Sequence, residues 1–239
     1  MTESPSVTGG LAWAGLAAAD ATRAVEFCCA AFDWEPSAAA GFVLLRSAGK
    51  QIALVYPQTP QARAANVTTH WTPFFVVDDM DAAVALAVEA GGMALRDPFD
   101  VPAGRIAALQ DPGGAPFSLW APRRAEGPAP SATGLWFMEL ATADPAAAQA
   151  FYAHVLGWTY TDEGGGATIH GPDGDLGRIR QREEVSDWLA SLRVPDVEEA
   201  AWRAEAVGAT RLGVTTIDAR GPVARIVDPQ RATLCLRES

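Results

Sequence analysis

The feature of this 239-residue chain that most restricts its fold is an internal repeat. The segment Leu16–Asp20 (LAAAD) returns as Leu140–Asp144 (LATAD), 124 positions later. The pair Asp111-Pro112 returns as Asp228-Pro229 after 117 positions, so the second copy is shorter by about seven residues. A surface loop absorbs such a difference at little entropic cost. The chain therefore consists of two related halves and not of one large domain.

The repeat places two tandem domains at residues 9–124 and 133–239. The stretch between them, 125–132, is rich in Pro and Ala and has no hydrophobic periodicity, so it is predicted to be a linker. Each copy then divides into two similar modules of one strand, one helix and three strands. The pattern therefore predicts an α+β protein with four such modules.

The start and stop signals of the helices carry this module pattern. Asp20 and Asp144 are N-cap residues, Pro145 takes a first helical position, and Gly157 follows a helix end. Asp78 or Asp79 caps the helix of the second module, and Pro195-Asp196 opens that of the fourth. The clearest strands in the first copy are predicted at 11–16, 42–46, 51–56, 74–77, 106–110 and 116–120.

Composition excludes several classes of partner. The chain has 18 Lys and Arg against 29 Asp and Glu, and a net charge of -11 disfavours nucleic acid and anionic membranes. No apolar run approaches the roughly 20 residues of a membrane span. Three cysteines do not build a disulfide framework, which favours a reducing, cytoplasmic setting. A monomer or a homodimer is expected.

Three motifs in this order resemble the glyoxalase/bleomycin-resistance/extradiol-dioxygenase superfamily, also called vicinal oxygen chelate proteins. They are Phe151-Tyr152 through Trp158, the run 70–79 (HWTPFFVVDD), and Asp111–Gly114 (DPGG) followed by Phe117–Trp120 (FSLW). The resemblance covers nearly the whole chain. It implies two tandem glyoxalase-like domains whose curled, mixed sheets form two cups.

Enzymes of this superfamily hold a divalent metal in the cup with His, Gln or Glu side chains on the first and last strands. None of the corresponding positions in this chain carries a His or a carboxylate, and Cys235 alone does not make a site. The positions are Trp13, Ala53, Thr72 and Ser118 in the first copy, and Phe137, Gly177 or Arg178, Leu189 and Cys235 in the second. We therefore expect no metal and no other cofactor.

Strand alternation predicts which side chains line the two cups, because residues two apart share a face. The first cup is aromatic, with His70 at its rim, and the second holds one carboxylate. The first lining is predicted as Trp13, Gly15, Ala53, Thr72, Phe74, Ser118 and Trp120. The second is predicted as Phe137, Glu139, Leu189, Ser191, Thr233, Cys235 and Arg237.

Glu139 is the candidate catalytic residue. A carboxylate under an aromatic cover loses solvation, which raises its pKa toward the range of a general acid or base. Arg237 or Arg178 nearby would hold it ionised. The alternative interpretation is structural, with Glu139 pairing with an arginine to tie strands together.

Three functions remain open. The first is an enzyme that needs no metal and uses Glu139 for isomerisation, cyclisation or dehydration of a hydrophobic, cyclic small molecule; the resemblance implies such steps in natural-product pathways. The second is a binding protein of the bleomycin-resistance type that sequesters an antibiotic, for which the acidic chain suits a cationic drug. The third is a scaffold without ligand.

Overall fold

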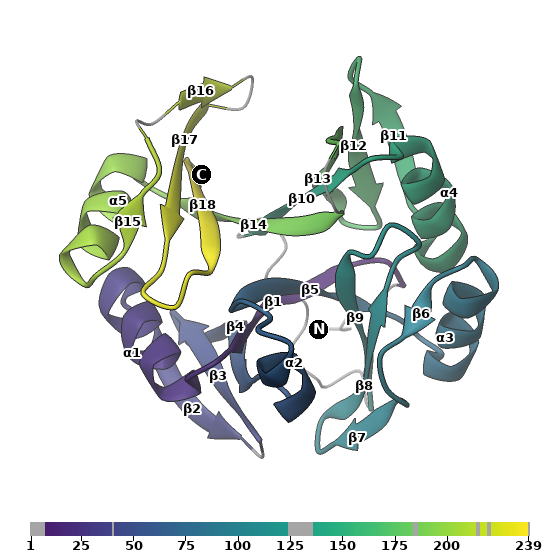
Figure 1. Cartoon of the computed structure of the whole chain (residues 1–239), viewed down its shortest axis with the longest axis horizontal. Helices are drawn as coiled ribbons and strands as arrows, with labels where there is room; N and C mark the ends of the chain where they lie inside the picture. The colour runs from purple at the N-terminus through teal and green to yellow at the C-terminus, as the bar shows by residue number, and fades with distance from the viewer. Residues whose placement is uncertain are drawn as a thin grey trace, which may run out of the picture. The chain divides into compact units, whose positions relative to one another are not determined.

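A computed structural model describes residues 8–39, 41–123, 136–183, 186–213, 216–218 and 221–238 (Figure 1). The predicted linker at 125–132 lies outside these residues. By its internal contacts the chain forms two compact units. Unit 1 comprises Met1–Ala12, Pro73–Thr133 and Phe137–Trp188, and unit 2 comprises Trp13–Thr72, Gly134–Trp136 and Leu189–Ser239. Each unit thus combines one module from each copy of the sequence repeat.

Unit 1 contains the second and third modules. The second module is built from β5, α3 and β6 to β9, with strand order β5-β9-β8-β6 and β7 paired to β8. The third is built from β10, α4 and β11 to β13, with strand order β11-β12-β13-β10. The bounds are β5 His70–Val76, α3 Met80–Glu89, β6 Met93–Ala94, β7 Phe99–Val101, β8 Gly104–Gln110, β9 Pro116–Pro122, β10 Trp136–Thr142, α4 Pro145–Leu156, β11 Thr159–Asp162, β12 Gly166–Gly171 and β13 Gly174–Gln181.

Unit 2 contains the first and fourth modules. Their strand orders are β2-β3-β4-β1 and β14-β18-β17-β15, with β16 paired to β17. The bounds are β1 Leu11–Ala18, α1 Ala21–Phe32, β2 Glu35–Ala39, β3 Phe42–Ser47, β4 Lys50–Pro57, α2 Pro60–Ala64, β14 Asp187–Val194, α5 Val197–Ala206, β15 Thr210–Arg211, β16 Thr216–Asp218, β17 Gly221–Val227 and β18 Thr233–Glu238.

The predicted fold class is confirmed, because each module is a strand, a helix and a group of further strands. In every module the first strand pairs in parallel with the last (β1 with β4, β5 with β9, β10 with β13, β14 with β18). The second and fourth modules each add one short strand, β7 or β16. The sequence also missed α2, a single short helix that Thr59 caps.

An aspartate begins each of the four long helices. Asp20, Asp79, Asp144 and Asp196 each accept a hydrogen bond from the backbone N–H three residues later, at 2.9 to 3.1 Å. Such a cap satisfies a donor that the first helical turn leaves without a partner. The choice between Asp78 and Asp79 is therefore settled in favour of Asp79.

The core of unit 1 is an aromatic cluster. The ring of Phe75 lies 4.8 Å from Trp158 and 5.7 Å from Trp188, measured between centroids. Tyr152 is fully buried, and its hydroxyl donates to Asp111 Oδ2 at 3.1 Å and accepts from Trp188 Nε1 at 3.1 Å. Burial raises the pKa of Tyr152, so this hydroxyl remains a donor. The cluster joins the second module to the third.

Unit 2 has its own, smaller aromatic core. Trp136 lies 6.1 Å from Trp34 and 5.2 Å from Trp71 between ring centroids, and its Nε1 donates to Ile52 O at 2.8 Å. Trp34 in unit 2 and Trp158 in unit 1 are therefore core residues at matching places, directly after helices α1 and α4. No helix in the described part of the chain is long and apolar enough to cross a bilayer.

The two Asp-Pro turns that revealed the repeat are built around buried carboxylates. Asp111 Oδ1 accepts from Ala115 N at 2.9 Å, and Asp228 Oδ1 accepts from Ala232 N at 2.8 Å. Both aspartates are under a tenth exposed. Burial raises the pKa of both carboxyl groups, against the opposing effect of the backbone N–H groups around them.

These raised pKa values predict a pH-dependent stability. A carboxyl group whose pKa in the folded state lies above the ordinary value of 3.8 adds to the free energy of unfolding when it is protonated. This stabilisation is fully present below pH 3.8 and is lost as the pH rises through the folded-state pKa. We therefore expect the free energy of unfolding of the wild type, relative to Asp228→Asn, to fall as the pH rises above about 4. Urea unfolding at several pH values measures this difference. A difference that is constant over the range would contradict the raised pKa.

Candidate functional site

Each of the two predicted cup linings contains residues from both units. In unit 1, Phe74 on β5 is the register partner of Ser118 on β9, and Trp120 lies two residues further along β9. All three side chains are at most 4% exposed. Alternation along the strands puts these three side chains on one face of the strand pair.

The unit 2 members of the first lining are Trp13 and Gly15 on β1, Ala53 on β4 and Thr72 on β5. Trp13 and Thr72 are both buried. Thr72 Oγ1 accepts a hydrogen bond from the Tyr56 hydroxyl at 3.4 Å, and burial raises the pKa of Tyr56. His70 is half-buried, with Nδ1 2.8 Å from Thr68 O. These groups offer hydroxyls and aromatic surface.

The unit 2 members of the second lining lie on β14 and β18. Ser191 is the register partner of Cys235, and both are buried. Arg237 lies two residues beyond Cys235 on β18 and is 5% exposed, and Leu189 is half-buried on β14. Ser191, Cys235 and Arg237 share one face by alternation.

The remaining members, Phe137 and Glu139, lie on β10 in unit 1. Phe137 is 2% and Glu139 8% exposed. Arg178 Nε donates to Glu139 Oε2 at 2.5 Å, and Arg178 Nη2 pairs with the same oxygen. Arg180 Nη1 lies 3.6 Å from Glu139 Oε1. We call these three charged residues, Glu139, Arg178 and Arg180, the Glu139 cluster.

Strand register explains why the cluster forms. Glu139 on β10 is the register partner of Arg178 on β13, which is in turn the partner of Thr168 on β12. The next row, Leu140 and Ile179, points to the other face and is fully buried. Since an apolar face is the one that a helix covers, we assign that face to α4, which contacts β13. The Glu139 cluster therefore lies on the face opposite α4.

One of the two arginines that the sequence suggests for Glu139 pairs with it. The sequence leaves Arg237 and Arg178 open, and the carboxylate pairs with Arg178. Arg180 was not considered, although alternation from Arg178 would have found it. The side chains of Glu139 and Arg178 are 10% and 16% exposed, so water screens this pair far less than a surface ion pair. The arrangement fits the structural interpretation, and it also leaves a carboxylate that a guanidinium orients.

The side chains at the expected metal positions do not fit the divalent metal that the resemblance implies. Over the residues that the structure describes, no group of three or more His, Cys, Asp or Glu side chains converges to hold an ion. A divalent metal needs three or four such ligands in the enzymes of this type. The described side chains therefore do not provide the ligand set that such a metal needs.

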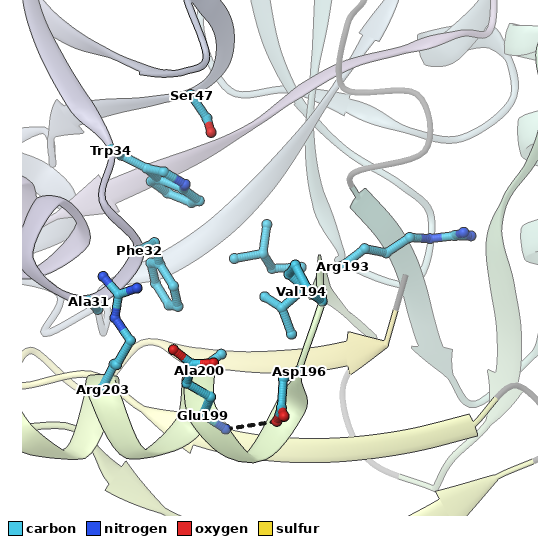
Figure 2. A pocket seen from close by; sticks show the side chains of 12 residues that line it. Ala31, Phe32, Trp34, Ser47, Arg193, Val194, Asp196, Glu199, Ala200 and Arg203 are labelled. Carbon is cyan, nitrogen blue, oxygen red and sulfur yellow. Dashed lines mark hydrogen bonds between the residues drawn. The ribbon is translucent and has the colours of Figure 1, made fainter.

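Unit 2 also holds a pocket that sequence reasoning missed. Its volume is about 270 Å³, and it lies where the end of α1 meets the start of α5. The rings of Phe32 and Trp34, 5.0 Å apart, line one side, while Glu199 and Arg203 project from α5 (Figure 2). Arg203 pairs with Asp33 at 2.5 Å. The spacing of Glu199 and Arg203 by one helical turn predicts that their side chains share a face of the helix. Nothing in the sequence indicates that this face lies against α1.

Family models match both halves of the chain. Residues 10–119 match the glyoxalase/bleomycin resistance protein/dioxygenase superfamily, and residues 137–237 match a glyoxalase-like domain. The chain belongs to this superfamily. The expected tandem arrangement is thereby confirmed.

Curated relatives of the superfamily match almost the whole chain. The anthracycline biosynthesis protein DnrV of Streptomyces peucetius is 28% identical, over 94% of this chain and 91% of its own length. The putative glyoxylase CFP32 of Mycobacterium tuberculosis is also 28% identical, over 92% and 91%. In both cases the similarity extends over nearly the full length of both chains.

Solved structures agree on the fold. The 2,3-dioxygenase LapB from Pseudomonas sp. KL28 superposes with a TM-score of 0.70 at 14% identity, covering 99% of this chain and 94% of its own. The Mn(II)-bound glyoxalase from Novosphingobium aromaticivorans gives 0.66 at 16%, covering 97% and 82%. At such identities the likeness describes architecture alone.

Proposed function

We propose that this protein acts on a hydrophobic, cyclic small molecule of a natural-product pathway and catalyses a proton transfer without a metal ion. The reaction class is isomerisation, cyclisation or dehydration. The Glu139 cluster is the observation that carries this proposal, because it sets an ion-paired, nearly buried carboxylate on the strand face opposite α4. The 28% identity to anthracycline biosynthesis proteins supports a pathway of this kind.

In the proposed step Glu139 is the general base. One oxygen of its carboxylate takes a proton from a C–H next to a carbonyl group of the substrate, and the C–H electron pair forms the C=C bond of an enolate. Arg178 and Arg180 supply positive charge that orients the carboxylate and offsets the negative charge of the enolate. Return of the proton at another atom completes an isomerisation with atoms and charge balanced.

The second candidate function is sequestration of a ligand without chemistry. The pocket of Figure 2 favours it, since two aromatic rings and the Glu199 carboxylate can hold an aromatic molecule that carries a positive charge. This pocket belongs to unit 2, whereas the Glu139 cluster belongs to unit 1. The two functions therefore use different residues and can be separated by mutation.

Two measurements on one compound panel distinguish these functions. Anthraquinones with and without a basic substituent are titrated while tryptophan fluorescence is recorded, and the same mixtures are then separated by chromatography with mass detection. Saturable quenching with a new product supports the enzyme. Quenching without product supports sequestration, and silence across the panel contradicts both. Stoichiometric Fe, Mn, Ni or Zn in the purified protein would contradict metal independence.

A further inference from the structure

The internal repeat provides a comparison within one chain at the corner where an Asp-Pro turn meets the start of a helix. In unit 2 this corner is occupied by a side chain of the protein. Gln230 follows Asp228-Pro229, and its amide Nε2 donates to Asp20 O at 2.8 Å while its Oε1 accepts from Asp20 N at 2.7 Å. A primary carboxamide thus satisfies both backbone groups of the residue that caps α1.

In unit 1 the equivalent corner holds no such side chain. The repeat aligns Gly113 with Gln230, and Asp144 with Asp20. A pocket of about 420 Å³ opens at this place, lined by the turn, by the start of α4 and by Ser186. Its volume exceeds the 270 Å³ of the pocket in Figure 2. The corner that is filled in unit 2 is therefore open in unit 1.

In this open corner the backbone N–H of Asp144 makes one long hydrogen bond within the described part of the chain. It donates to Thr142 Oγ1 at 3.3 Å. The matching N–H of Asp20 in unit 2 donates to Gln230 Oε1 at 2.7 Å. Ser186 Oγ donates to the same Thr142 oxygen at 2.7 Å, and Ser186 and Thr142 are both more than nine-tenths buried. Two buried hydroxyls thus stand beside a backbone group whose counterpart in unit 2 binds an amide.

Ser186 also prevents the chain from filling the corner itself. A Cβ added to Gly113 would overlap Ser186 Oγ, so this position takes no side chain while the serine is present. The lining is acidic: Asp111, Asp144 and Glu183 contribute to it, and none of the described residues that line the pocket is basic. A ligand that carries a positive charge beside its hydrogen-bonding group therefore suits the pocket better than a neutral one.

We propose that this corner pocket of unit 1 binds a small molecule that presents a carboxamide, or an equivalent donor and acceptor pair, next to a positively charged amine. The ligand would take at Asp144 the place that Gln230 takes at Asp20, and its amine would lie toward Glu183. The site uses none of the residues of the Glu139 cluster, so it stands independently of the proposed catalytic function.

The probe is β-alaninamide, which combines both groups, and its neutral analogue is propionamide. Titration into ¹⁵N-labelled full-length protein should shift the amide resonances of Asp144 and Ser186, with a dissociation constant in the millimolar range that is expected of about six heavy atoms. β-Alaninamide should bind at least about threefold more tightly than propionamide. Glu183→Gln should remove that preference and leave propionamide binding unchanged.

Two variants test the two corners by filling the one in unit 1 and opening the one in unit 2. Gly113→Gln combined with Ser186→Gly fills the unit 1 pocket as unit 2 is filled, and should weaken binding at least tenfold. Gln230→Gly opens the unit 2 corner, and should add propionamide-dependent shifts at the Asp20 amide. Circular dichroism and the unaffected resonances report whether each variant is folded. Absence of shifts at Asp144 in the wild type, or shifts that survive in the filled variant, would overturn the proposal.

Discussion

Glu139→Gln should lower the turnover of the proposed reaction by about 10²- to 10⁴-fold, the range that a positioned general base contributes. Glutamine keeps the shape of the side chain and accepts a hydrogen bond from Arg178, but it does not take a proton. The loss should appear in kcat while binding, measured by tryptophan quenching, changes little. Chromatographic product analysis at saturating substrate measures the effect.

Glu89→Gln is the matched control for that substitution. Glu89 also belongs to unit 1, but it is exposed at the end of α3 and belongs neither to the Glu139 cluster nor to the predicted linings. It should retain wild-type turnover. A Glu139→Gln variant that is folded and fully active would remove Glu139 from the mechanism and leave it the role of tying β10 to β13.

Tyr152→Phe should lower the free energy of unfolding by about 2–4 kcal/mol. The substitution removes one hydroxyl and leaves two buried partners, Asp111 Oδ2 and Trp188 Nε1, without it. Each buried polar group that loses its hydrogen bond costs about 1–3 kcal/mol, and a carboxylate costs the most. Urea unfolding followed by near-ultraviolet circular dichroism measures the change, because Trp188 lies in the same cluster.

Tyr160→Phe also removes one buried tyrosine hydroxyl, but it is expected not to lower the free energy of unfolding in the way that Tyr152→Phe does. The Tyr160 hydroxyl is buried, and it has no hydrogen-bond partner in the described part of the chain. Its removal should leave the free energy of unfolding within about 1 kcal/mol of the wild type or raise it slightly. Equal destabilisation by the two variants would show that ring packing, and not the Tyr152 hydrogen bonds, accounts for the loss.

Local chemistry made the modules predictable. The four aspartate caps act on backbone groups three residues away, and the Asp-Pro turns act on groups four residues away, so each signal is complete within a short stretch of chain. Strand alternation likewise placed Glu139 on the same face as Phe137.

Longer-range pairings could not be obtained in this way. Nothing local selects Arg178 as a partner of Glu139, since the pairing depends on the register between β10 and β13. The pocket beside Phe32 and Trp34 depends on α1 meeting α5, two helices that are far apart in the chain. Strand register within the third module creates the first feature, and packing between the first and fourth modules creates the second.

The sequence by itself determined the fourfold module, the aspartate that starts each long helix, and the pairing of the two Asp-Pro turns, because all of these rest on short-range hydrogen bonds and hydrophobic periodicity. Only the tertiary structure decided that each compact unit joins modules from different copies. It alone revealed that Gln230 fills one corner while Gly113 leaves the other open. The physical reason is that a cavity is the space between elements that meet only after folding, and no single stretch of sequence encodes it.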